Sequence, residues 1–78
     1  MTVTTTAIDL EAIRLGDWIT VEDARGNRAR GPVLVADTRV ELGAFNTSLT
    51  VARRSRDGAP LHIVASLRLL DHQPQLFD

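Results

Sequence analysis

Few residues of this chain have both the chemistry and the spacing that a catalytic or metal site needs. The chain has two histidines, His62 and His72, and no spaced cluster of His, Asp and Glu that could supply three or four converging metal ligands. No serine has a base beside it in a nucleophile motif, and the scattered glycines form no phosphate-binding loop. Asp17 and Asp23 flank one predicted strand, too far apart for a catalytic pair of carboxylates. We therefore expect no enzyme, no metal site and no cofactor.

The basic side chains offer a second kind of chemistry, contact with nucleic-acid phosphates. All nine basic residues are arginine, and six fall into two groups that we expect in loops: Arg25, Arg28 and Arg30, and Arg53, Arg54 and Arg56. Such loops can grip phosphates, and an exposed aromatic can stack on a base. Trp18 is out of phase with the apolar residues of its strand, so it is either such a platform or covered by the N-terminal segment. The net charge of −1 adds no overall attraction for nucleic acid or an anionic membrane.

The end of the chain, HQPQLFD over residues 72–78, joins a polar stretch to an apolar pair, Leu76 and Phe77. Exposed ends are usually polar, so this pair is either displayed for a partner or folded back as a plug on the domain. Gln73 offers both donors and acceptors, and Pro74 favours an extended Gln73, which lowers the entropy lost on docking. We interpret residues 72–75 as a spacer that leaves the domain.

The segment Gln73-Pro74-Gln75-Leu76-Phe77 resembles the clamp-binding motif of bacteria, the linear peptide by which polymerases and repair factors dock on the replicative β sliding clamp. The family pattern has Gln first, Leu fourth and Phe fifth, and this chain matches it at Gln73, Leu76 and Phe77. It departs at Pro74 and Gln75, where the family commonly has an aliphatic residue and then Ser or Asp. The resemblance implies that the clamp is the partner and that Leu76 and Phe77 are the apolar anchors, with an affinity of about micromolar strength.

The elements that must position these residues are predicted to be short strands. Apolar residues alternate with polar ones, or form short β-branched runs, over residues 17–22, 32–36, 39–42, 49–53, 61–65 and 67–70. Turn residues separate these segments, and Asp57-Gly58 predicts a tight hairpin. Thr6 is the expected cap of a short helix that Gly16 ends. The expected core comprises Ile19, Val21, Val33, Val35, Leu49, Val51, Leu61, Ile63 and Leu67.

Five or six short strands with regularly spaced turns predict a mainly β fold, a small barrel preceded by a short helix or extended segment. The layout over residues 15–71 resembles the SH3-like barrels in its opening at Gly16, Asp17, Ile19 and Val21, its Asp-Gly hairpin and its break at Ala65-Ser66. An OB-like barrel is the alternative. With 78 residues the chain forms one domain, which we place at residues 7–71, between a flexible N-terminus (1–6) and a C-terminal tail (72–78).

These features predict a non-enzymatic protein-interaction module that docks on the bacterial sliding clamp through its tail. It would be a replication or repair accessory factor, or a phage-encoded competitor for the clamp. Two alternatives stay open: a small nucleic-acid-binding barrel that uses its arginines, and a phage structural or assembly protein. The chain has no cysteine, no N-terminal basic-then-apolar segment and no membrane-spanning apolar run, so we expect a cytoplasmic location without membrane contact. The oligomeric state is left open.

Overall fold

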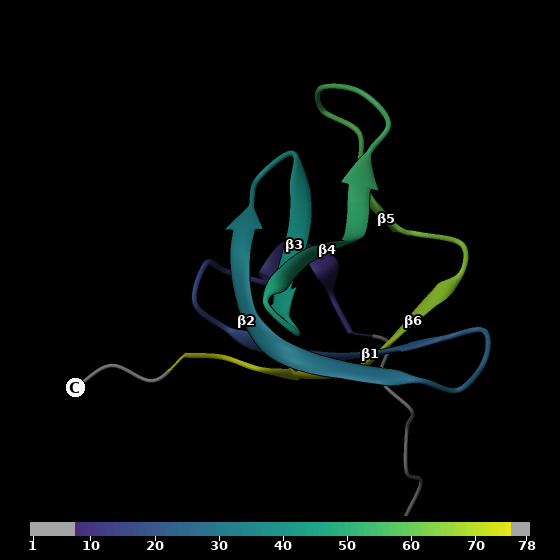
Figure 1. The fold of residues 1–78 in the computed structure, drawn as a ribbon. Helices are drawn as coiled ribbons and strands as arrows, with labels where there is room; N and C mark the ends of the chain where they lie inside the picture. The colour runs from purple at the N-terminus through teal and green to yellow at the C-terminus, as the bar shows by residue number, and fades with distance from the viewer. Residues whose placement is uncertain (1–7, 76–78) are drawn as a thin grey trace, which may run out of the picture.

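The computed structural model of the chain describes residues 8–75, which form a small, nearly closed barrel of six antiparallel strands (Figure 1). The strands are β1 (Trp18–Asp23), β2 (Arg28–Ala36), β3 (Arg39–Ala44), β4 (Thr47–Arg54), β5 (Leu61–Ile63) and β6 (Leu67–Gln73), and a turn of 3-10 helix, η1 (Leu10–Ala12), precedes them. The predicted mainly β fold class is therefore confirmed. No helix within residues 8–75 is long and apolar enough to span a membrane.

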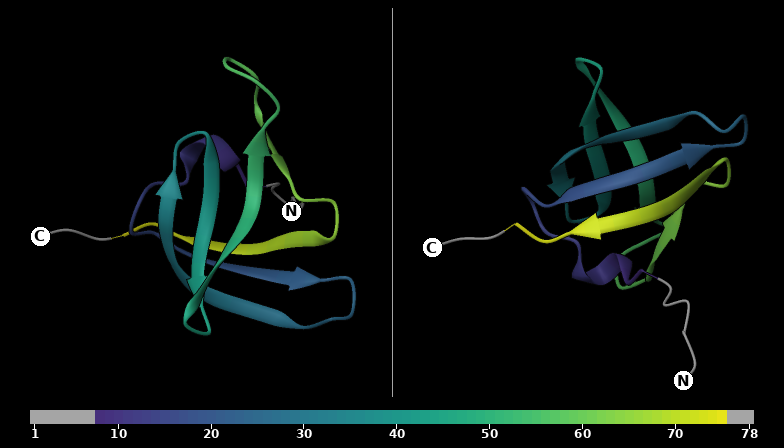
Figure 2. Two further views of the ribbon diagram at one scale, coloured as in Figure 1. Left: turned by 45° about the horizontal axis from the view of Figure 1, so that its top comes forward. Right: turned by 90° about the horizontal axis from the view of Figure 1, so that it is seen from below.

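The first five strands follow one another as a meander, and the sixth returns to the first. The order is β5-β4-β3-β2-β1-β6, so β6 lies beside β1 (Figure 2, right). Strand β2 is shared, because residues 28–32 pair with β1 and residues 33–36 pair with β3. A Cβ at Gly31 would lie 1.9 Å from the carbonyl oxygen of Gly43. Glycine at this position therefore lets β2 bend closely against β3 and close the barrel.

The core lies inside the barrel and agrees with the prediction in part. Five of the predicted residues are buried: Ile19, Val21, Val33, Val51 and Leu61. Four are only half-buried: Val35, Leu49, Ile63 and Leu67. A β-bulge between Val33 and Val35 shifts Val35 out of phase with the core, and Ile63 ends the short edge strand β5. The prediction omitted four further buried residues: Ile13, Val40, Leu42 and Ala52.

The boundaries of several elements differ from the prediction. Strand β2 begins at Arg28 rather than at Pro32, and β6 runs on to Gln73, so residues 72 and 73 belong to the sheet and not to a spacer. The tight hairpin predicted at Asp57-Gly58 is wrong, since residues 55–60 form a longer loop between β4 and β5. The N-terminal helix is reduced to η1, which Asp9 caps by accepting from the backbone N–H of Glu11 at 2.9 Å. Thr6, the expected cap, lies outside the described residues.

The turn between β3 and β4 is formed by two consecutive residues in the left-handed region. Phe45 has φ +53° and Asn46 has φ +61°, the pattern of a type I′ turn, which matches the twist of a hairpin. Asparagine tolerates this conformation, whereas it costs most other residues about 1–2 kcal/mol. Phe45 is also 80% exposed, so burial within the barrel does not offset that cost.

Candidate functional site

The side chain of Asp17 joins the loop before β1 to the C-terminal end of the described chain. Its carboxylate is buried and accepts hydrogen bonds from the backbone N–H of Arg14 at 2.9 Å, the backbone N–H of Gln75 at 2.9 Å and Nε2 of His72 at 2.7 Å. An ionised carboxylate only accepts, so Nε2 of His72 is the donor. The Gln75 side chain lies over Gly16, where φ is +91° and a Cβ would come within 2.0 Å of Gln75 Oε1. We call these five residues the Asp17 clasp.

The clasp keeps Asp17 ionised although it is buried. Burial raises the pKa of the Asp17 carboxyl, but the hydrogen bonds from His72, Gln75 and Arg14 outweigh burial and hold this pKa below its usual value. The donors come from the loop before β1, from β6 and from the segment after β6. Because groups of the chain itself surround the Asp17 carboxylate, the role of this carboxylate is structural. It holds the chain in place at His72 and Gln75.

The predicted docking residue Gln73 lies at the exposed end of β6, next to Trp18 and Arg30. Gln73 opposes Trp18 in the β1–β6 ladder, and Nη2 of Arg30 donates to Oε1 of Gln73 at 2.7 Å. The Arg30 guanidinium lies 5.0 Å from the centre of the Trp18 ring, within the range of a cation–π interaction. Trp18 is 42% exposed. This Trp18–Arg30–Gln73 cluster therefore presents an aromatic face, a guanidinium and an amide to solvent.

The other two predicted docking residues, Leu76 and Phe77, lie outside the described residues. They follow directly after Gln75, whose backbone N–H is bound by Asp17. The structure thus describes one of the three predicted docking residues, Gln73.

The two predicted arginine groups do not come together. Two of the six arginines lie in loops, Arg25 and Arg56. The other four belong to strands, which corrects the expectation of two arginine loops: Arg28 and Arg30 to β2, and Arg53 and Arg54 to β4. The β1–β2 loop and the β4–β5 loop project from different sides of the barrel (Figure 2, left). The arginines therefore do not form one continuous basic surface.

Carboxylates of the chain already pair with some of these arginines. Glu22 binds Arg28 at 3.2 Å and also Arg68. Glu11 binds Arg54 at 2.7 Å. The hydrogen bonds from arginine lower the pKa of both glutamates below the usual value. Arg30, in contrast, donates to the neutral side chain of Gln73, so this bond does not neutralise its positive charge. Arg30 also lies over the ring of Trp18.

The remaining polar residues that the sequence analysis considered, His62, Asp17 and Asp23, lie apart from one another within residues 8–75. His62 is exposed on β5, and Asp17 and Asp23 lie at opposite ends of β1. The Asp23 carboxylate closes the β1–β2 turn by accepting from the backbone N–H of Arg25 at 2.8 Å and of Asn27 at 2.9 Å. In the part of the chain that the structure describes, no group of three or more His, Cys, Asp or Glu side chains could hold a metal ion.

Sequence reasoning missed the clasp although one signal for it was present. Asp17 alternates in phase with Ile19 and Val21, which face the core, so a buried carboxylate in need of donors could have been predicted from the strand pattern. Nothing in the sequence pointed to His72 and Gln75 as those donors, because they are more than fifty residues away.

Comparison with known proteins adds no relative. No family model, no curated protein and no solved structure matches the chain.

Proposed function

We propose that this protein is a non-enzymatic interaction module that docks on the bacterial DNA sliding clamp through Gln73, Leu76 and Phe77. The observation that carries the proposal is the anchoring of the C-terminal segment: the Asp17 clasp holds His72 and Gln75, while the Gln73 side chain between them is exposed. A docking peptide that starts from a fixed point on a rigid domain loses less conformational freedom on binding than one on a free tail. The barrel is then the scaffold of a replication or repair accessory factor, or of a phage-encoded clamp competitor.

Calorimetric titration of the intact protein into a purified bacterial sliding clamp tests this proposal. We expect a dissociation constant of about 1–50 µM, as for other short peptide contacts. Because the anchors are apolar, raising the salt from about 50 to about 200 mM should change the affinity by less than about threefold. Absence of binding at both salt concentrations would contradict the proposal.

The Trp18–Arg30–Gln73 cluster favours a second candidate function, binding of single-stranded nucleic acid. An exposed indole with a guanidinium 5.0 Å from its centre combines a stacking surface for a base with a positive charge for a phosphate. This candidate predicts binding of a single-stranded oligonucleotide that weakens steeply between about 50 and about 200 mM salt. If no oligonucleotide binds even at the lower salt, this candidate is eliminated.

The substitution Arg30→Ala separates the two candidates, because it changes their affinities in opposite directions. For clamp docking, Gln73 must exchange its hydrogen bond to Arg30 for bonds to the clamp. Removing an exposed hydrogen bond worth about 1 kcal/mol should therefore strengthen clamp binding by roughly two- to fivefold. For nucleic-acid binding, the same change removes the charge beside Trp18 and should weaken binding at least about fivefold.

The matched control for Arg30→Ala is Arg25→Ala, in the exposed β1–β2 turn away from Gln73. It removes the same charge from the chain, so any effect of net charge alone will appear in both variants. Equal clamp affinities for Arg30→Ala, Arg25→Ala and the wild type would show that Gln73 does not leave Arg30 on docking.

We also propose that the barrel is of the SH3-like rather than the OB-like kind. The support for this is the meander of five strands whose sixth strand pairs with the first. The distinction assigns no function, since such small barrels bind peptides, nucleic acids and other subunits alike.

A further inference from the structure

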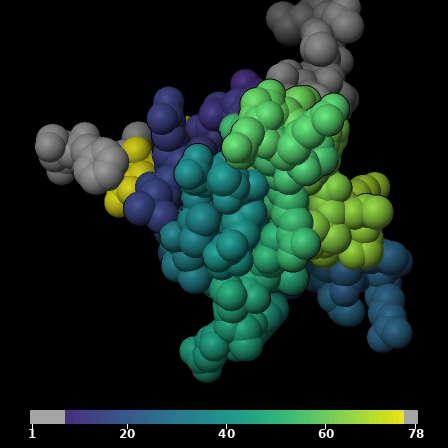
Figure 3. Space-filling model, turned by 90° about the horizontal axis from the view of Figure 1, so that it is seen from above, coloured from purple at the N-terminus to yellow at the C-terminus, as the bar shows by residue number. Residues whose placement is uncertain are grey.

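The tip of the β3–β4 hairpin, residues 44–47, stands out from the body of the barrel (Figure 3). It carries Phe45, which at 80% is the most exposed large hydrophobic residue within residues 8–75. The turn holds Phe45 at a positive φ that glycine or asparagine would adopt with less strain. Burial in the barrel therefore does not explain why an aromatic residue occupies this turn, and strained positions of this kind are typical of binding surfaces.

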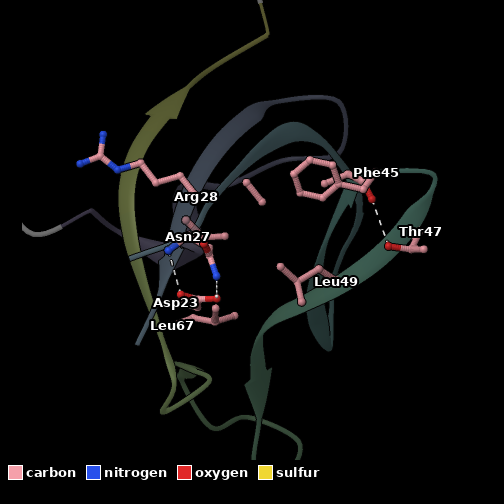
Figure 4. A pocket seen from close by; sticks show the side chains of 10 residues that line it. Asp23, Asn27, Arg28, Phe45, Thr47, Leu49 and Leu67 are labelled. Atoms are coloured by element: carbon pink, nitrogen blue, oxygen red, sulfur yellow. Dashed lines mark hydrogen bonds between the residues drawn. The ribbon is translucent and has the colours of Figure 1, made fainter. Parts of the chain in front are cut away.

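A pocket of about 250 Å³ opens beside this tip, at the mouth of the barrel (Figure 4). Phe45 and Leu49 lie on one side of it, and Asp23, Asn27 and Arg28 lie on the other. Apolar side chains from five strands form most of its lining: Val21, Ala29, Ala44, Leu49 and Leu67. The pocket is smaller than most small-molecule sites, and its size suits a single side chain.

The polar groups at the rim of the pocket are already bonded within the chain. The Asp23 carboxylate accepts from the backbone N–H of Asn27 at 2.9 Å and from Nδ2 of the same residue at 3.2 Å. Arg28 donates through Nε to Glu22 at 3.2 Å, and Oγ1 of Thr47 donates to the carbonyl of Ala44 at 3.0 Å. The rim residues therefore do not require a charged ligand, and the pocket favours an apolar side chain from an uncharged segment.

We propose that this end of the barrel is a self-association surface, at which Phe45 of each of two copies enters the pocket of the other. A two-fold interface requires the protruding side chain and the pocket to lie on the same surface, and Phe45 lies at the rim of the pocket. The tip over residues 44–47 carries no charge, so its insertion takes no charged side chain of the tip out of water. Near the axis the two Phe45 rings can also contact each other. Two short tips and two small pockets form a small interface, so the dimer is weak and reversible.

Sedimentation velocity on the full chain, from about 10 µM to about 1 mM, tests the proposal. We expect the sedimentation coefficient to rise with concentration. Phe45→Asn should weaken the association at least about tenfold, because it removes the apolar anchor. Asparagine suits the left-handed turn, so this variant should unfold at the same temperature as the wild type or at a higher one, which separates lost association from lost folding. The control Leu15→Asn, at a residue that is 65% exposed and does not line the pocket, should associate as the wild type does.

A dilution series of NMR spectra then locates the contact. We expect the concentration-dependent shifts to gather at Phe45 and at pocket residues such as Val21, Leu49 and Leu67. A wild type that stays monomeric at about 1 mM, or a Phe45→Asn variant that associates as strongly as the wild type, would overturn the proposal. Association that is lost when Leu76 and Phe77 are replaced, but kept in Phe45→Asn, would also overturn the proposal, because the tail would then be the contact. None of these results depends on the sliding clamp.

Discussion

Asp17→Asn should lower the free energy of unfolding by about 2–4 kcal/mol, the largest effect on stability that we predict for a polar side chain of this protein. The asparagine side chain has one oxygen where the carboxylate has two, and its NH₂ group would face a backbone N–H of Arg14 or Gln75 or the Nε2 donor of His72. The site is buried, so water cannot replace the lost acceptor. The C-terminal end of β6 and the loop before β1 should loosen together.

Thermal unfolding followed by circular dichroism measures this effect. For a domain of this length, we expect the Tm of Asp17→Asn to fall by roughly 10–20 °C. The matched control is Asp71→Asn, which makes the same change at an exposed carboxylate of β6 and should shift the Tm by no more than about 3 °C. Equal Tm values for the two variants would mean that the clasp does not stabilise the fold.

The lowered pKa of Asp17 also predicts how stability depends on pH. A carboxyl whose pKa is lower in the folded than in the unfolded chain contributes stability above its unfolded pKa, and that contribution is lost as the pH falls through the folded pKa. Since an unfolded Asp titrates near pH 3.9, the wild type should lose this contribution below about pH 4. The stability of Asp17→Asn should fall less steeply there. If the free energies of unfolding of the two proteins fell in parallel between about pH 5 and pH 2, Asp17 would not be the cause of the loss of stability at low pH.

Replacing Leu76 and Phe77 together by alanine should weaken clamp binding by at least about 100-fold. Burying two such side chains in an apolar pocket is worth roughly 3–6 kcal/mol in total, and each 1.4 kcal/mol corresponds to a factor of ten.

The unfolding temperature of the same variant separates the two interpretations of the tail. A docking peptide predicts a Tm within about 2 °C of the wild type, whereas an apolar plug on the barrel predicts a fall of at least about 5 °C.

The control for this variant is Gln75→Ala, at a motif position where the family varies. Asp17 binds the backbone N–H of Gln75, which alanine keeps, so the clasp should hold. We expect clamp affinity within about threefold of the wild type for Gln75→Ala. Equal losses of affinity for Gln75→Ala and for the double variant would indicate that the segment binds in a different way from the clamp motif.

The sequence predicted those parts of the fold that depend on local alternation. Ile19 and Val21 are in phase and buried, and Trp18, which is out of phase with them, is exposed. The start of β2 was missed because Arg28, Ala29 and Arg30 resemble a polar loop. They form a strand because they pair with residues 20–22 of β1, a contact that no local pattern reveals.

The candidate sites depend on contacts between distant segments, and the sequence showed only their components. Gln73, Trp18 and Arg30 were each singled out, for two different functions, but strand pairing alone brings them into one cluster. The Asp17 clasp joins residues 14–17 to residues 72–75 and was not expected. Phe45 carried no sequence signal, because phenylalanine is not a typical residue of a type I′ turn.

Competition at the clamp tests the central claim most directly. A fluorescent peptide with the clamp-binding motif is bound to a bacterial sliding clamp, and the 78-residue protein is titrated against it while the anisotropy is followed. If Gln73, Leu76 and Phe77 occupy the peptide pocket, the protein will displace the labelled peptide with a midpoint in the micromolar range, and the Leu76→Ala/Phe77→Ala variant will not. Full retention of the labelled peptide at about 500 µM wild-type protein would contradict the proposed function.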